Sequence, residues 1–462
     1  MSARLNSNQA RDIAYYLHPY TNLSVHEKEG PLIITRGEGV YVYDDGGKRY
    51  IEGLGGLWCA SLGFSEERLV EAALRQMRKL PFYHTFGAKS SEPGIELAER
   101  LLAMAPVPMS KVFFANSGSE SNDTAVKLIW YYHNAIGKPE KKKIIARLRG
   151  YHGVTVAAAS LTGLPNNHRD FDLPIARILH TDCPHHYRYG KPGESEEDFA
   201  TRLAESLEAL ILKEGPETVA GFFAEPVMGG GGVIPPPKTY FEKVQKVLKK
   251  YDVLFVADEV ICGFGRTGNM FATQTYSLQP DMITIAKQLS AAYMPIAGLM
   301  INEKIYRALV SESEKIGIFA HGFTYGGHPV PAAVALETLK IYEERQTVSH
   351  VQRVAPHFQR RLRELGQHPL VGEARGVGLM GGLELVKNKS TREPFAPSDG
   401  VGPYAAKLAL ENGVITRGMI DTLGFSPPLI ITEREIDELF DAVKRALDQA
   451  HAGLRQRQLV AA

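Results

Sequence analysis

The fold of this chain is decided by two apolar runs that each end in a charged residue, Val253-Leu-Phe-Val-Ala-Asp258 and Asp281-Met-Ile-Thr-Ile-Ala-Lys287. Apolar runs of this length are typical of buried strands in a parallel sheet that helices cover on both faces. Ligands of such sheets bind beyond the carboxyl ends of the strands. We therefore expect Asp258 and Lys287 to belong to one site at that edge.

Three further runs predict strands of the same sheet, at residues 111–116, 143–147 and 219–225. Apolar residues at helical spacing over residues 199–210 predict a helix between the last two of these strands. Strands that alternate with helices favour an α/β domain with a mostly parallel sheet flanked by helices. We expect residues 71–330 to form this large domain.

The rest of the chain has a different pattern. Residues 1–30 are expected to be irregular, and short strands are predicted at residues 31–35 and 40–47. Residues 331–345, 351–365 and 433–451 have helical patterns, and residues 381–386 have a strand pattern. We expect a C-terminal small domain of residues 331–462 that also includes the N-terminal segment 1–70 and has an α+β architecture.

The composition favours small-molecule partners. The chain has 53 lysines and arginines against 52 aspartates and glutamates, and the resulting formal net charge of +1 is too small to attract it to nucleic acid or to anionic lipid. Three scattered cysteines argue against a disulfide framework. No apolar stretch is long enough to span a bilayer, and the first eight residues lack the apolar core of a signal peptide. A cytoplasmic location is expected.

A lysine amine and a carboxylate at one edge of a sheet suit pyridoxal phosphate above other cofactors. This cofactor needs a lysine that forms a Schiff base with its aldehyde. It also needs an acid that keeps its pyridine nitrogen protonated, so that the ring can accept electrons. We expect Lys287 and Asp258 to fill these two roles.

Three neighbouring segments could complete such a site. Asn116-Ser-Gly-Ser-Glu120 follows a strand and opens a helix, so it could bind a phosphate. In isolation ordinary helix capping is the more common reason for such a motif, but Lys287 and Asp258 at the strand ends favour the phosphate. Tyr151 could stack on a planar cofactor or could be a core tyrosine. Glu225 ends a strand, and its carboxylate could have a structural or a catalytic role.

Two other patterns are misleading. Gly376-Val-Gly-Leu-Met-Gly381 has the glycine spacing of a dinucleotide-binding loop, but it leads into a strand pattern and not into a helix. Cys183, His185 and His186 lack the spacing of metal ligands and a fourth partner. We expect no metal site.

Several motifs together resemble the class III, or omega, aminotransferases of pyridoxal-phosphate fold type I. The resemblance covers nearly the whole chain and is closest to the aminotransferases that act on amines or omega-amino acids with pyruvate. The motifs are Asn116-Ser-Gly-Ser-Glu-Ser-Asn-Asp-Thr-Ala-Val-Lys127, Gly150-Tyr-His-Gly153, Ala224-Glu-Pro-Val227, Ala257-Asp-Glu-Val-Ile-Cys-Gly-Phe-Gly-Arg-Thr-Gly268, Ile285-Ala-Lys287 and Gly322-Phe-Thr-Tyr-Gly-Gly-His-Pro329.

The resemblance implies a role for each cofactor-binding residue. Lys287 is expected to be the Schiff-base lysine and proton shuttle, and Asp258 the partner of the pyridine nitrogen. Thr324 is expected to reach the phosphate of a neighbouring subunit, which implies a homodimer with shared sites and leaves a tetramer open. The remaining contacts to the ring and the phosphate are assigned to Ser117, Gly118, Ser119, Tyr151, His152, Glu225 and Val260.

The resemblance also implies a substrate pocket. Arg417, in the segment of residues 413–428, resembles a mobile arginine that binds the carboxylate of pyruvate or alanine; without the resemblance it would be taken for a surface charge. Apolar amines are expected to pack on Leu57, Trp58, Phe86 and Tyr151. The implied reaction is ping-pong transfer of an amino group from an amine or omega-amino acid to pyruvate, which yields alanine.

Other functions compete with this one. An aminotransferase that uses 2-oxoglutarate, a decarboxylase and an aminomutase could all share the fold. Gln288 and Met228-Gly-Gly230 depart from the residues usual in the family, Gly and Gln-Gly-Ala, and these departures concern the pocket and not the chemistry. A regulatory protein without turnover is disfavoured by the presence of both Lys287 and Asp258. The sequence leaves the donor amine and the stereopreference open.

Overall fold

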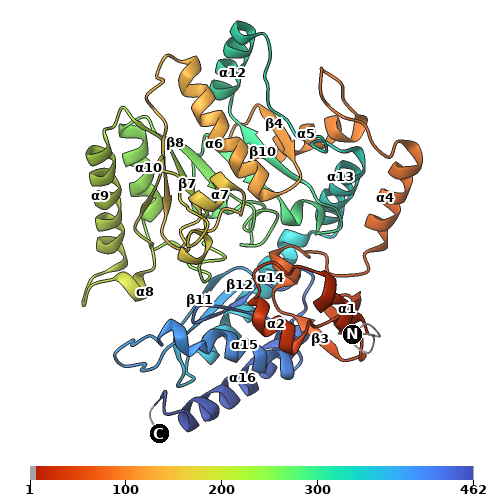
Figure 1. The fold of residues 1–462 in the computed structure, drawn as a ribbon, viewed down its shortest axis with the longest axis vertical. Helices are drawn as coiled ribbons and strands as arrows, with labels where there is room; N and C mark the ends of the chain where they lie inside the picture. Colours follow the sequence, from red (N-terminus) through yellow and green to blue (C-terminus); the bar gives the residue numbers. More distant parts are fainter. Residues whose placement is uncertain (1–6, 461–462) are drawn as a thin grey trace.

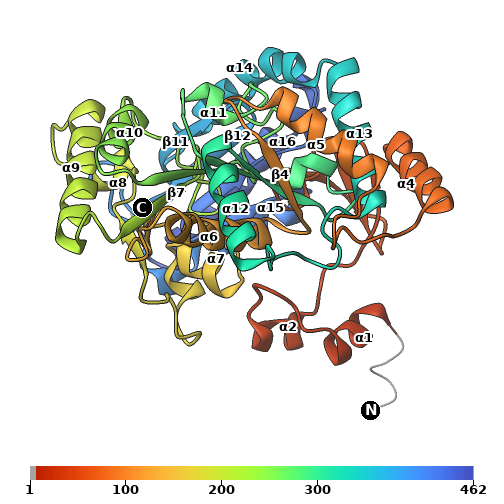
Figure 2. The same cartoon turned by 90° about the horizontal axis from the view of Figure 1, so that it is seen from above.

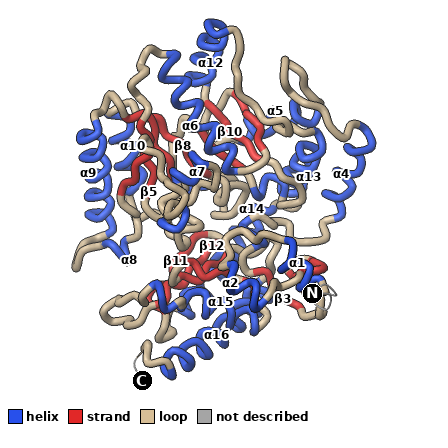
Figure 3. Tube along the Cα trace, in the orientation of Figure 1, coloured by secondary structure: helices blue, strands red, loops and turns tan. Residues whose placement is uncertain are grey.

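The computed structural model describes residues 7–460. Most of the first eight residues, which lack the apolar core of a signal peptide, therefore lie outside the described residues. Its strands gather in two regions, one in the upper and one in the lower part of the molecule (Figures 1 and 3). The upper region is one seven-stranded sheet. Its strands are, in spatial order, β4 (Lys111–Ala115), β10 (Ala297–Ile301), β9 (Met282–Ile285), β8 (Leu254–Asp258), β7 (Val219–Ala224), β5 (Lys143–Arg147) and β6 (Ile178–Thr181).

The sheet is mostly parallel, as predicted. The five strands from β9 to β6 pair in parallel. Strand β10 is antiparallel to both of its neighbours, β4 and β9. The sequence patterns predicted five of the seven strands and missed β6 and β10.

Helices cover both faces of this sheet, and alternate residues of each strand belong to different cores. Along β8, Phe255 and Ala257 pack in one core, whereas Leu254 and Val256 pack in the other. The first core includes side chains of α4 (Glu67–Lys79), α5 (Glu92–Met104), α9 (Glu196–Glu214), α10 (Tyr240–Lys250) and α13 (Pro329–Glu344). The second includes side chains of α6 (Gly118–Ala135), α7 (Val156–Leu161) and α12 (Glu303–Ile316).

The lower region contains two four-stranded sheets and a core of its own. The first sheet has the order β1 (Ile34–Glu38), β2 (Tyr41–Asp44), β3 (Arg49–Glu52) and β13 (Val414–Ile415). The second has the order β11 (Val371–Val377), β12 (Met380–Leu385), β15 (Thr422–Phe425) and β14 (Arg417–Met419). The helices that pack in this core are α14 (Thr347–Leu365), α15 (Val401–Glu411) and α16 (Glu433–Gln456).

Residues 376–381 comprise the end of β11, a two-residue turn and the start of the antiparallel strand β12, so the glycine spacing there is not a dinucleotide-binding loop. Helix α13 packs against α4 and α5. The division of the chain at residues 70 and 330 stays a prediction.

Among the described residues, no helix is long and apolar enough to cross a membrane.

Residues 1–30 were expected to be irregular, and for the described residues among them, 7–30, this expectation is wrong. Two helices form there, α1 (Asn8–Tyr15) and α2 (Leu23–Glu29), and they extend from one side of the molecule (Figure 2). Each begins at a capping side chain: Ser7 accepts a hydrogen bond from the Ala10 N–H, and Asn22 accepts from the Ser24 and Val25 N–H groups. These caps satisfy N–H groups at the start of each helix, and the polar composition of the segment concealed them.

Candidate active site

Two neighbouring parallel strands deliver Asp258 and Lys287 to the same edge of the large sheet. Strand β8 ends at Asp258, which pairs in register with Thr284 of β9. Lys287 follows β9 and begins the 3-10 helix η3 (Lys287–Ser290). Its φ of 51° lies in the left-handed region, which is uncommon for a residue with a Cβ and often marks a functional site.

A cavity of about 200 Å³ lies at this edge. It gathers nine of the predicted site residues from the ends of four strands and the start of α6. They are Ser117, Gly118, Ser119, Tyr151, His152, Glu225, Asp258, Val260 and Lys287, and the lining also includes Asn122, Gly153 and Ile261.

Lys287 has the electrostatic environment of a reactive amine. Burial lowers the pKa of its ammonium group, and the attraction of Asp258 opposes this effect only in part. A lowered pKa increases the fraction of uncharged amine near neutral pH, and the uncharged amine is the nucleophilic form.

Asp258 is held as a carboxylate. It is only 3% exposed, and burial alone would raise its pKa. The Nδ1 of His152 lies 2.7 Å from its Oδ2, the Asn122 side-chain amide donates to Oδ2 at 2.8 Å, and the Val260 N–H donates to Oδ1 at 3.1 Å. These contacts outweigh burial, so the pKa of Asp258 lies below its usual value.

Glu225 positions Tyr151. Its Oε1 accepts a hydrogen bond from the Tyr151 N–H at 3.0 Å, and its Oε2 accepts from the Gly229 N–H at 2.9 Å. Burial raises the pKa of this carboxyl. Both carboxylate oxygens of Glu225 accept hydrogen bonds from backbone N–H groups, and this favours a structural role over a catalytic one.

The start of α6 has the features of an anion site. Ser117 caps the helix by accepting from the Glu120 N–H, and the first N–H groups of a helix have no partner within it. Gly118 allows a close approach, because a Cβ there would lie 3.0 Å from both methyl groups of Val260. The helix dipole adds a partial positive charge at this end.

These residues fit pyridoxal phosphate. The buried Asp258 carboxylate has no lysine or arginine within ion-pair distance among the described residues, so it can take a protonated ring nitrogen as its cation. The start of α6 offers donors for the phosphate, and Tyr151 offers an aromatic face. The cofactor supplies an aldehyde that binds amines and a ring that withdraws electrons from the bound substrate.

Four residues predicted to bind substrate do not line this cavity: Leu57, Trp58, Phe86 and Arg417. Trp58 is buried in an apolar cluster with Leu54, Met419 and Ile261, and of these only Ile261 lines the cavity. Leu57 is 54% exposed. Phe86 is 47% exposed and lines a separate cavity of about 640 Å³.

Thr324 lies outside the cavity as well. It is exposed, in a loop whose neighbouring residues Gly322 and Phe323 line the same cavity as Phe86. The described chain therefore brings neither Thr324 nor Phe86 to its own Lys287.

Arg417 is connected to the cavity by Tyr20, a residue for which the sequence predicted no role. Its guanidinium carbon lies 5.5 Å from the ring centroid of Tyr20, in the loop between α1 and α2. The Tyr20 and Tyr151 rings meet edge to face, with centroids 6.5 Å apart. Burial raises the pKa of Tyr151, and the neighbouring Tyr20 hydroxyl adds to the effect.

Asn122 and Tyr20 are two residues at the site to which the sequence assigned no role. Asn122 lies one turn into α6, and only the packing of that helix against β8 shows that its amide faces Asp258. The position of Tyr20 depends on the two unpredicted helices on either side of it.

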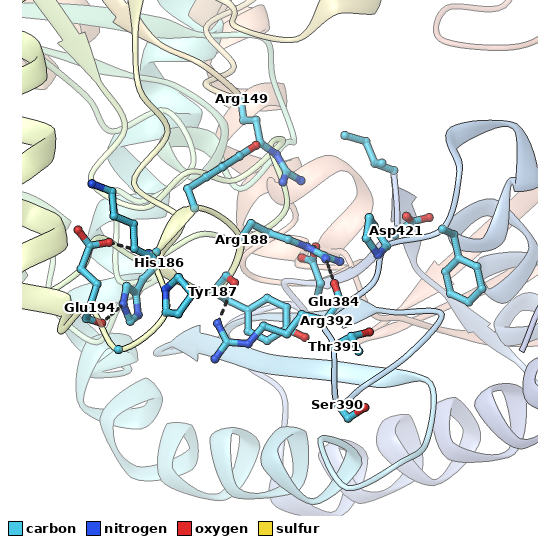
Figure 4. Close-up of a pocket in the computed structure, with 18 of the residues that line it drawn as sticks. Arg149, His186, Tyr187, Arg188, Glu194, Glu384, Ser390, Thr391, Arg392 and Asp421 are labelled. Atoms are coloured by element: carbon cyan, nitrogen blue, oxygen red, sulfur yellow. Dashed lines mark hydrogen bonds and ion pairs between the residues drawn. The ribbon is translucent and has the colours of Figure 1, made fainter. Parts of the chain in front are cut away.

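A larger cavity, of about 990 Å³, lies elsewhere and contains neither Lys287 nor Asp258 (Figure 4). Three charged groups of its lining are paired: Arg188 with Glu384, and Glu194 with Arg202, which does not line the cavity. His186, which is drawn there, contacts the Glu194 carbonyl. Its neighbour in sequence, His185, contacts Glu373 and not a cysteine.

Comparisons with known proteins agree with this geometry. The aminotransferase class-III family matches residues 23–447. Gamma aminobutyrate transaminase 3, chloroplastic, of Solanum lycopersicum is 54% identical over 418 residues, which cover 90% of this chain and 80% of that protein. The structure of the omega transaminase from Pseudomonas jessenii in complex with PMP is 56% identical, with a TM-score of 0.95, and the match covers 96% of this chain and 98% of that one.

A structure described as a transaminase with L-ala is 60% identical, with a TM-score of 0.90, and the match covers 92% of this chain and 100% of that one. The family match spans most of the chain, and the matched structures share its fold over almost their whole length. The chain is therefore a member of the class III, or omega, aminotransferases, which use pyridoxal phosphate.

Proposed function

We propose that this aminotransferase moves an amino group from an amine or omega-amino acid to pyruvate, giving alanine, in a ping-pong reaction. The observation that carries the proposal is the meeting of Lys287, Asp258 and Tyr151 in one cavity, with Arg417 next to it through Tyr20. The first three residues serve the cofactor, and Arg417 serves the acceptor.

Lys287 is the proposed attachment point of the cofactor and the group that moves the substrate proton. Its lowered pKa favours the uncharged Nζ, which can attack an aldehyde carbon and can accept a proton from the substrate. Asp258 stays ionised near neutral pH and holds a proton on the ring nitrogen.

The other cavity residues hold the cofactor. Ser117, Gly118 and Ser119 are assigned to the phosphate, because they stand at the start of α6. Tyr151 and Val260 are assigned to the two faces of the ring. Gly230 leaves room next to the first of them, since a Cβ there would lie 3.1 Å from the Cβ of Tyr151.

Pyruvate is the proposed acceptor because it has one carboxylate, whereas the rival acceptor 2-oxoglutarate has two. The residues that line the cavity include no arginine, and Arg149, close to Tyr151 in sequence, lines the separate cavity of Figure 4. Arg417 is therefore the candidate for a single bidentate contact. A matched transaminase solved with L-ala supports this acceptor, and a relative named as a gamma aminobutyrate transaminase supports omega-amino acid donors.

A homodimer is part of the proposal. Phe82, Tyr83, Phe86 and Tyr325 are exposed, and the rings of Phe82 and Tyr325 are 5.7 Å apart. Grouped exposed aromatic side chains are typical of protein interfaces. A partner at this surface would bring Phe86 and Thr324 to the partner's cavity.

We also propose a cytoplasmic location, which the three unpaired cysteines support.

Separate half-reactions test the acceptor. We expect L-alanine to convert the loaded enzyme to the amine form of the cofactor, and pyruvate to restore the aldehyde form. L-glutamate and 2-oxoglutarate should act far more slowly. Equal rates with glutamate and alanine would instead identify 2-oxoglutarate as an acceptor. The molar mass in solution, measured by light scattering, tests the dimer.

A further inference from the structure

Three metal-binding side chains meet in the N-terminal segment. Asp12 lies in α1, His26 in α2 and His18 in the loop between them, and their ligand atoms all lie within 4.8 Å of one another. The Oδ1 of Asp12 is 2.8 Å from the Nε2 of His18 and 3.2 Å from the Nε2 of His26. Figure 2 shows the two helices side by side at the edge of the molecule.

The Nε2 of His26 lacks a hydrogen-bond partner. Its side chain is 8% exposed, and its buried Nε2 forms no hydrogen bond, because the contact with Asp12 does not have hydrogen-bond geometry. A buried polar atom without a partner is costly and calls for a ligand. Asp12 and His18 are 19% and 24% exposed, so an ion could reach the group from solvent.

We propose that Asp12, His18 and His26 bind a zinc ion. Zinc prefers imidazole nitrogen and carboxylate oxygen in a tetrahedral arrangement, and three protein ligands leave the fourth position for water. Zinc–ligand bonds of about 2.0–2.1 Å place neighbouring ligand atoms roughly 3.3 Å apart. The two contacts of Asp12, at 2.8 and 3.2 Å, are close to this separation, and the two imidazole nitrogens lie within 4.8 Å of each other, so side-chain rotations can bring the three ligands around one ion.

The expectation of no metal site rested on Cys183, His185 and His186, and it did not consider Asp12, His18 and His26, which do not have the spacing of a known zinc motif. Their meeting depends on the turn of the chain between α1 and α2. An ion bound there ties both helices to the loop between them. The same loop carries Tyr20, which contacts Tyr151 and Arg417, so the ion fixes the segment that borders the active-site cavity.

Zinc binding to the untagged holoenzyme, measured by equilibrium dialysis with metal analysis, tests the site. We expect one zinc ion per chain, and Asp12→Asn, His18→Gln and His26→Gln should each weaken binding by at least about a hundredfold. His451→Gln is the matched control, because His451 and His368 also lie close together, near Asp448. The proposal is overturned if no zinc binds, if the three variants bind it normally, or if the control abolishes binding.

Amide hydrogen exchange of the unmutated holoenzyme gives a test that does not depend on the folding of variants. Adding zinc should slow exchange in α1 and α2 at least about tenfold and leave α16 unchanged, because the ligands lie only in the N-terminal segment. A chelator should reverse the effect. Zinc binding without any change in α1 and α2 would place the ion elsewhere and overturn the proposal.

Discussion

The Nδ1 of His152 lies 2.7 Å from the Oδ2 of Asp258, and both side chains are buried at the carboxyl end of β8. Asn122 donates to the same oxygen from α6. Burial alone would raise the pKa of Asp258, whereas its hydrogen bonds lower it. His152 and Asn122 therefore keep the carboxylate ionised, and this charge is what a protonated ring nitrogen requires.

Asp258→Asn should remove this charge and retain the shape of the side chain. A hydrogen bond to a charged group contributes about 1.5–3 kcal/mol, so we expect the alanine half-reaction to slow by about tenfold to a hundredfold. Cofactor binding should weaken much less. Stopped-flow absorbance measures the rate. Asn122→Ala leaves the carboxylate in place and should cause a smaller loss, whereas an unchanged rate in Asp258→Asn would contradict the role of Asp258.

Lys287→Ala should lose both the visible absorption band of the lysine-bound cofactor and all transamination. The reason is that no other lysine lines the cavity. Borohydride reduction of the unmutated enzyme, followed by peptide mapping, locates the label directly. Lys304→Ala, which removes an ion pair with Asp281 outside the cavity, should keep the band. A label on any lysine except Lys287 would refute the assignment.

Glu52→Gln should change the pH dependence of stability. Burial raises the pKa of Glu52 from 4.5 to about 8, although the Leu54 N–H donates to it. Between these two values the folded chain keeps a proton that the unfolded chain has lost. Stability therefore falls as the pH rises through this window, by at most about 1.4 kcal/mol per pH unit.

Glutamine stays neutral, so the variant should match the unmutated protein near pH 4 and exceed its unfolding temperature increasingly up to pH 8. Thermal unfolding at several pH values measures the difference. The exposed Glu38→Gln is the control and should leave the pH profile unchanged. Parallel profiles for Glu52→Gln and the unmutated protein would show that Glu52 titrates normally.

The sequence predicted those strands whose residues are almost all apolar, because burial on both faces leaves a continuous signal. It missed β6, a four-residue strand that contains His180, and β10, where Gly298 weakens the strand pattern. It also missed α1 and α2, which contain no buried residue except His26. Their helical pattern was too weak to distinguish from a polar coil.

The candidate site was predictable where one strand end supplies one side chain. Asp258, Glu225 and Lys287 each follow an apolar run, and the sheet brings such ends together. Asn122 and Tyr20 were not predictable, because their positions depend on helix packing. The roles of Thr324 and Phe86 stay predictions, since both depend on a second subunit.

Arg417→Ala should separate the two substrate classes. The guanidinium of Arg417 stacks on Tyr20, whose ring contacts Tyr151 in the cavity, so it can leave this aromatic contact to bind a carboxylate. Losing a bidentate charged contact costs a few kcal/mol at most, which is about a hundredfold in specificity for alanine and pyruvate. An arylalkylamine has no carboxylate and should still convert the cofactor at a near-normal rate.

Single-turnover absorbance with L-alanine and with an arylalkylamine measures the two rates for Arg417→Ala in the same preparation. Arg392→Ala is the matched control, because that arginine lines the separate cavity of Figure 4 and should affect neither rate. Tyr20→Phe keeps the aromatic ring under the guanidinium of Arg417 and should also preserve both rates. Tyr20→Leu removes the aromatic face and should change the affinity for alanine. If Arg417→Ala slows both half-reactions equally, Arg417 has a structural role, and another group binds the carboxylate of the acceptor.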